Sequence, residues 1–146
     1  MLAKSLVIFI GVGVLSGFTF GFYLLDIKNT NQLVFVDGSS ISIVTEKSDF
    51  KKGEEIKITI INSGTMPLTF SDTSYGLKIS GLFGIMMYSP PTSQVITTLK
   101  PTEEIVFVWD QMKNDNIPVL EGLYKISSDG IDSMGNKVEK SITINI

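Results

Sequence analysis

The stretch EIKITII, residues 55–61, decides the fold class predicted for this chain. Isoleucines alternate there with Lys57 and Thr59. Because successive side chains of a β-strand point to opposite faces, the isoleucines share one face and the polar residues share the other. This period of two is typical of a strand with one face in a core and one face in water.

Similar runs follow one another along the chain with turn residues between them, and no convincing amphipathic helix separates them. A parallel sheet would need crossover helices. The pattern therefore predicts an all-β domain over residues 33–146, an immunoglobulin-like antiparallel β-sandwich of seven to nine strands. The other runs are residues 33–36, 41–45, 67–71, 76–80, 94–99, 103–109, 122–128 and 140–146, and the turns are Asp37-Gly38, Asn62-Ser63-Gly64, Asp129-Gly130 and Gly135-Asn136.

An uncharged apolar run, residues 6–25, precedes this domain between Lys4 and Asp26. A helix needs about 20 apolar residues to cross a hydrocarbon core. We interpret residues 1–25 as an N-terminal transmembrane anchor and 26–32 as a short tether. A cleaved secretory signal is the alternative, but the run ends in FYLL without a small-residue cleavage site. Lys4 on the N-terminal side favours a cytoplasmic N-terminus and an extracytoplasmic domain in the cell membrane.

Composition removes several classes of chemistry. The chain has no cysteine and no histidine, which excludes disulfides, a cysteine nucleophile, a His-based triad and the usual zinc sites. Its net charge of −3 argues against a nucleic-acid partner, which requires a basic surface. Acidic pairs could bind calcium, but each lies at a strand edge or in a turn, where solvated charges are ordinary, so they indicate no calcium site. We therefore expect no catalytic residue, no cofactor and no metal ligand, and the protein is predicted not to be an enzyme.

Three segments resemble the intracellular proteinase inhibitor (BsuPI-like) family. They are FKKGEEIKITIINSGTMPLTFSDTSYGLKI, which begins at Phe50, TLKPTEEIVFVWDQ, which ends just after Trp109, and EGLYKIS, in which Glu121 stands where a proline is common. The resemblance covers about residues 50–126. It implies a small immunoglobulin-like β-sandwich and the inhibition of proteinases.

Small residues recur on one side of the predicted membrane helix. Gly13, Gly17 and Gly21 are four residues apart, and Ser16 lies beside them. Spacing of this kind aligns residues on one helix face, where missing side chains let a second helix approach closely. We interpret these residues as a docking stripe for another transmembrane helix, of a second copy or of another subunit, although glycine is also common in membrane helices.

The segment GLFGIMMYSPP, residues 81–91, is the candidate partner loop of the domain. Adaptable methionines and an amphipathic tyrosine are frequent on recognition surfaces. The composition favours the other interpretation, a buried strand closed by a Pro-Pro turn, because exposed patches of this apolar character are uncommon. The candidate residues are Leu82, Phe83, Ile85, Met86, Met87, Tyr88 and Pro90.

Together these features predict a non-catalytic single-pass membrane protein whose head binds protein partners, as an accessory subunit of a membrane-associated assembly. Its expected partners are membrane lipid, another transmembrane helix and a protein that contacts the β domain. Two alternatives remain open at this point: a membrane-tethered proteinase inhibitor, and a pilin-like or archaellum-type filament component.

Overall fold

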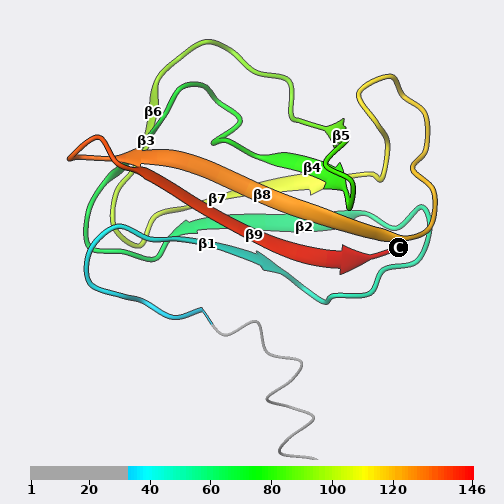
Figure 1. Cartoon of the computed structure of the whole chain (residues 1–146), viewed down its shortest axis with the longest axis horizontal. Helices are drawn as coiled ribbons and strands as arrows, with labels where there is room; N and C mark the ends of the chain where they lie inside the picture. Colours follow the sequence, from blue (N-terminus) through cyan, green and yellow to red (C-terminus); the bar gives the residue numbers. More distant parts are fainter. Residues whose placement is uncertain (1–32) are drawn as a thin grey trace, which may run out of the picture. The chain divides into compact units, whose positions relative to one another are not determined.

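Alternating apolar residues form β-strands throughout residues 33–146, the part of the chain that the computed structural model describes (Figure 1). The predicted membrane helix and its glycines lie outside these residues. Within residues 33–146 there is no helix that could cross a membrane. The strands of this region are β1 (Ile41–Thr45), β2 (Ile56–Asn62), β3 (Leu68–Phe70), β4 (Lys78–Gly81), β5 (Met86–Tyr88), β6 (Thr97–Leu99), β7 (Glu104–Trp109), β8 (Leu123–Asp132) and β9 (Lys137–Asn145).

The first sheet contains three antiparallel strands in the order β1-β2-β7. The stretch that predicted the fold lies in its central strand, β2. Ile60 pairs with Ile43 on one side and with Ile105 on the other, which places apolar residues of all three strands in one row. The isoleucines of β2 at the even positions are fully buried, whereas Lys57 is exposed, as the period of two predicted.

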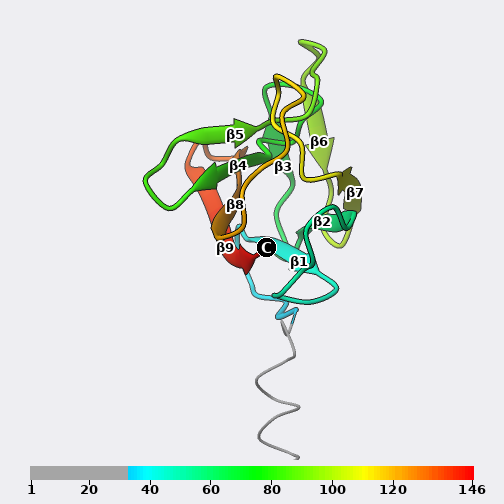
Figure 2. The same ribbon diagram turned by 90° about the vertical axis from the view of Figure 1, so that its right-hand side faces the viewer.

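The second sheet contains six strands and is organised by β8, its longest strand. One edge of β8 pairs with β9 from Leu123 to Ile131. The other edge pairs with β4 near its start and with β3 at its end. β5 then extends the sheet beyond β4, and β6 extends it beyond β3. The view in Figure 2 shows β4, β5 and β8 on one side of the domain and β1, β2 and β7 on the other.

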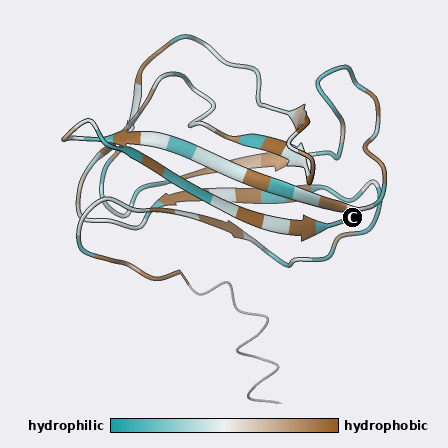
Figure 3. Cartoon of the chain, in the orientation of Figure 1, coloured by the Kyte–Doolittle hydropathy of each residue, from teal (hydrophilic) through white to brown (hydrophobic). Residues whose placement is uncertain are grey.

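Apolar side chains from both sheets form one core, so the domain has the character of a β-sandwich. Figure 3 shows the alternation of hydrophobic and hydrophilic residues along β8 and β9 that creates the inner face. Trp109, at the end of β7, is fully buried, and its ring lies 6.1 Å from that of Tyr88 and 6.0 Å from that of Tyr124. The Trp109 indole N–H donates to the Met112 carbonyl at 2.8 Å, which satisfies its only polar group.

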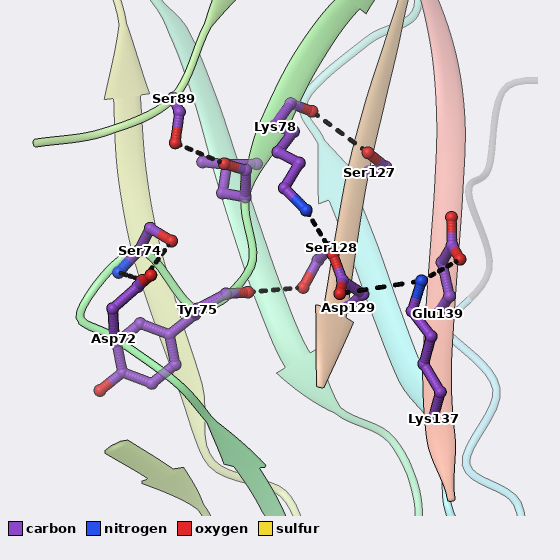
Figure 4. A network of polar contacts seen from close by, with 11 residues as sticks. Asp72, Ser74, Tyr75, Lys78, Ser89, Ser127, Ser128, Asp129, Lys137 and Glu139 are labelled. Atoms are coloured by element: carbon purple, nitrogen blue, oxygen red, sulfur yellow. Dashed lines mark hydrogen bonds and ion pairs between the residues drawn. The ribbon is translucent and has the colours of Figure 1, made fainter. Parts of the chain in front are cut away.

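Paired charges cover the outer face of the second sheet near β9 (Figure 4). The Lys78 ammonium on β4 lies 3.0 Å from the Asp129 carboxylate on β8. The Lys137 ammonium on β9 lies 3.8 Å from the same carboxylate and 3.0 Å from that of Glu139. These contacts raise the pKa of Lys137, with the hydrogen bond to Glu139 as the largest cause. The network links three neighbouring strands on the solvent side.

Two local predictions from the sequence are wrong. Asp129-Gly130 is not a turn, because β8 continues to Asp132. Gly130 serves packing there: a Cβ atom would lie only 2.7 Å from the Phe70 ring, so a side chain would not fit. Residues 33–36 form no strand and are exposed, although the Val36 N–H donates to the Ser63 carbonyl at 2.9 Å.

Candidate functional site: an exposed apolar hairpin

The candidate partner loop forms a hairpin between β4 and β5. Its turn is closed by two hydrogen bonds, from the Gly81 N–H to the Ile85 carbonyl at 3.0 Å and from the Gly84 N–H to the Gly81 carbonyl at 2.9 Å. Gly84 has a φ of 79°, a conformation that favours glycine. The strand pairing shifts register between Ile79 and Ser80, an irregularity of the β-bulge type that changes the strand direction near the tip.

The tip of this hairpin, residues 82–86, projects apolar side chains into solvent. The Phe83 side chain is 97% exposed, and the other apolar residues of the tip, Leu82, Ile85 and Met86, are all exposed. The buried-strand interpretation is therefore wrong for these residues. Clustered exposed apolar side chains on a monomer commonly mark a contact surface.

The base of the hairpin is packed into the domain. Met87 and Tyr88 are half-buried against the core, and Pro90 is buried. Burial raises the pKa of the Tyr88 hydroxyl, and the Asp110 carboxylate contributes in the same direction. The Asn114 N–H donates to the Met87 carbonyl at 3.1 Å. The seven candidate residues thus divide into an exposed tip and a base that holds the tip in place.

An open polar groove of about 800 Å³ lies beside this base. Segments from four connections meet there, so no single motif in the sequence indicates it. The Asp72 carboxylate accepts hydrogen bonds from the hydroxyl and the N–H of Ser74, which lower its pKa. The Asp110 carboxylate accepts from the Met112 N–H at 3.1 Å. The groove is lined by Glu55, Asp72, Tyr88, Ser89, Pro90, Pro91, Thr92, Val108, Asp110, Met112, Lys113, Asn114 and Asn116.

These carboxylates serve the local backbone. Each of the two accepts hydrogen bonds from its own turn, which is the ordinary role of aspartate in such turns. Among residues 33–146, no group of three or more acidic, histidine or cysteine side chains could hold a metal ion. The docking residues Gly13, Ser16, Gly17 and Gly21 lie outside the described part of the chain. The apolar hairpin tip is therefore the candidate site on the described domain.

Comparison with known proteins leaves the family of this chain open. No protein-family model matches the chain, and no curated protein matches it. Among solved structures, the sporulation control protein Spo0M from Bacillus subtilis is similar, with 14% sequence identity and a TM-score of 0.41. The match covers 75% of this chain and 49% of the Spo0M chain, so this chain spans about half the length of that protein.

Proposed function

We propose that this protein is a non-catalytic, single-pass membrane protein whose β-sandwich head binds a protein partner through the hairpin tip. The observation that carries the proposal is the nearly complete exposure of Phe83 within a group of exposed apolar residues. Aromatic and methionine side chains are enriched where proteins recognise one another. The tip would bury these side chains in the partner and would gain the hydrophobic free energy that it lacks in the free protein.

The rigid base supports this assignment. A preorganised loop loses less conformational entropy on binding than a flexible one. Tyr88 contributes to the hairpin base by packing on Trp109, and the turn hydrogen bonds define the tip. The hairpin therefore offers a partner one fixed arrangement of apolar groups.

We further propose that the sandwich is immunoglobulin-like. Tyr124 lies at the start of β8. Its hydroxyl donates to the Leu120 carbonyl, four residues earlier in the chain, at 2.6 Å. A tyrosine at a strand start that bonds back to the preceding backbone is a hallmark of immunoglobulin-like sandwiches. The fully buried Trp109, whose ring packs against Tyr124, adds to this likeness.

In this proposal the apolar run of residues 6–25 anchors the head at the cell membrane, outside the cytoplasm, as part of a larger assembly. The stripe of Gly13, Gly17 and Gly21 would contact a neighbouring helix within the bilayer. Lateral assembly and partner capture would then use separate parts of the chain.

Co-purification from native membranes, followed by quantitative mass spectrometry, tests the binding proposal. We expect Phe83→Ser to remove at least one protein that the parent chain retains. Met134→Ser is the matched control, because Met134 is 69% exposed but lies in the β8–β9 turn. Retention of every partner by Phe83→Ser, or equal losses from both variants, would contradict a role for the tip.

A tethered proteinase inhibitor is the second candidate, because an exposed hairpin is also the kind of segment that an inhibitor presents to a protease. The full chain in detergent should then inhibit at least one member of a panel of serine, cysteine and metalloproteases. Phe83→Ser would weaken that inhibition, while Met134→Ser would leave it unchanged. Absence of inhibition across the panel would exclude this candidate for the enzymes tested.

A further inference from the structure

The outer edge of β7 has backbone groups that no other described strand pairs with. β7 ends the three-stranded sheet, so only its inner edge contacts β2. The Asn62 N–H donates to the Glu103 carbonyl at 3.0 Å and its carbonyl accepts from the Thr102 N–H at 3.0 Å, so the backbone groups of Asn62 point toward the β7 side of β2. Bonded and non-bonded pairs alternate along an antiparallel ladder. The N–H and C=O groups of Glu104, Val106 and Val108 therefore point away from β2.

The side chains along this edge are suited to pairing. Val106 is 42% exposed and Val108 is 56% exposed, both on the outer face of the sheet. No charged residue lies between Glu104 and Asp110. Soluble proteins usually protect an exposed strand edge with charges, proline or a bulge, because an open edge recruits another strand. β7 has none of these between its first and last residues.

We propose that β7 pairs with β7 of a second copy of this chain, antiparallel about a two-fold axis at Val106. The two three-stranded sheets would then join into one sheet across the dimer. Val106 would face Val106 of the second copy, and Glu104 would face Val108. This proposal goes beyond the binding function above, because it uses a strand edge that is separate from the hairpin tip.

Charge complementarity selects this register. Lys57 on β2 lies directly beside Val108 on β7, so Glu104 of the second copy would arrive two strands away from Lys57. That separation is about 10 Å between backbones, a distance that lysine and glutamate side chains span together. Within one copy, Glu104 is paired with Ile61, about 13 Å along β2 from Lys57. Among residues 33–146, neither Lys57 nor Glu104 forms an ion pair.

The neighbouring registers are less favourable. A shift of two residues in one direction places the two Glu104 carboxylates diagonally across the new ladder, where like charges repel. The opposite shift places Glu104 against Asp110. If one β7 strand shifts by one residue, backbone groups that point away from β2 face groups of the second copy that point toward its own β2. The hydrogen bonds between the two β7 strands are then lost.

Cysteine substitution in the full chain, in native membranes or detergent, tests the register. The parent chain has no cysteine, so every disulfide formed comes from the substituted position. In a hydrogen-bonded pair the Cα atoms lie about 5.5 Å apart, within the range that a disulfide spans. We expect Val106→Cys to form a disulfide-linked dimer on mild oxidation. In the proposed dimer the two Val108→Cys positions would be about 13 Å apart along the strands, so this variant should not become disulfide-linked.

The double variant Glu104→Cys/Val108→Cys supplies a second measurement, because each new cysteine would face the other type in the second copy. It should also cross-link. Equal cross-linking of Val106→Cys and Val108→Cys would contradict the register. Contact through the membrane helices alone would bring the heads together without fixing which residues of the two β7 strands face each other. Absence of cross-linking in both Val106→Cys and the double variant would overturn the proposal.

A charge exchange in the Val106→Cys background tests the ion pair. We expect Lys57→Glu or Glu104→Lys alone to lower the cross-linking rate by about fivefold, and the combination to restore it to within about twofold. Failure of the combined variant to recover would contradict the predicted contact. Phe83→Ser should leave cross-linking unchanged, so failure of this proposal and failure of the binding function are distinguishable.

Discussion

The two sheets of this domain end in edge strands of opposite character. β9 carries Lys137, Glu139 and Lys140 near its start, and Lys137 joins the network with Asp129. β7 begins with Glu104 and is uncharged to its end. Charges on an edge oppose the approach of a foreign strand, since pairing would strip them of water. The difference indicates that one edge is protected from pairing and the other remains available for it.

Each strand has one buried residue on its inner face, and the contrast concerns their solvent sides. Trp109 of β7 and Ile144 of β9 are both almost completely buried. The other inner residues of β7, Ile105 and Phe107, are half-buried against the core, whereas Val106 and Val108 are exposed on the outer face. The predictions below separate the inner face from the outer face, and the β7 edge from the β9 edge.

The largest effect is expected from truncation of the inner anchor of β7. Trp109→Ala should lower the free energy of unfolding by about 3–5 kcal/mol, because it leaves a large cavity and removes the indole hydrogen bond. Val108→Ala, on the outer face of the same strand, should change it by at most about 0.5 kcal/mol. Urea unfolding of the full chain in detergent, followed by circular dichroism, measures both. Comparable losses would show that the outer face of β7 is structural.

A smaller effect is expected at Gly130 in β8, on the side of the domain with the protected edge. Gly130→Ala should cost about 1–3 kcal/mol of stability, because the new methyl group would collide with the Phe70 ring. The matched control is Gly81→Ala, whose Cβ atom would lie 3.4 Å from only the flexible end of Met87. If Gly130→Ala lowers the free energy of unfolding by less than Gly81→Ala does, then β8 can move away from Phe70 of β3 without loss of packing.

Acid should weaken the β8–β9 hairpin through Asp132. Its carboxylate accepts hydrogen bonds from the Asn136 and Met134 N–H groups and from the Ser39 hydroxyl, which lower its pKa in the folded state. A lowered pKa contributes stability above the unfolded value of about 3.9, and this contribution is lost as the pH falls through the folded value. Asp132→Asn should flatten this acid limb. The measurement is the urea midpoint of the parent chain and of Asp132→Asn between pH 2 and pH 7. If both midpoints fall equally steeply with acid, Asp132 is not responsible for the loss of stability.

The smallest effect is expected from the charged network at the β9 edge. Asp129→Asn should lower the free energy of unfolding by about 0.2–1 kcal/mol, since partly exposed ion pairs are weak. The loss should diminish in high salt because mobile ions screen such pairs. Lys125→Gln, an exposed position on β8 without an ion pair among residues 33–146, is the control. A loss far above this range would mean that the network holds β8 and β9 together as well as covering them.

The strands themselves could be predicted from the sequence where the period of two is clear. The run at residues 41–45 became β1 with the predicted bounds, and EIKITII became the central strand β2. The strand predicted at residues 122–128 ended too early, because Asp129-Gly130 has the composition of a turn, whereas β8 continues to Asp132. Only the close approach of Phe70 explains a glycine there, and Phe70 is distant in sequence.

The candidate site could be predicted in part. The apolar residues of 82–90 were found from their composition, but the division between Phe83 in solvent and Pro90 in the domain depends on where the turn falls. Gly81 and Gly84 close that turn. The apolar composition favoured a buried strand instead, and that interpretation is wrong because Leu82 to Met86 are exposed. The open edge of β7 could not be predicted, because an edge is defined by which strands are neighbours.

β8 gives the domain a central point of cooperativity. It hydrogen-bonds to β9 on one side and to β4 and β3 on the other, so none of these strands can detach without exposing part of it. Amide hydrogens in the middle of β8 should therefore exchange with deuterium last, through global opening alone. Those of the Leu82–Met86 tip should exchange much sooner, because exchange there requires only local opening of an exposed turn and no separation of the sheet beneath it.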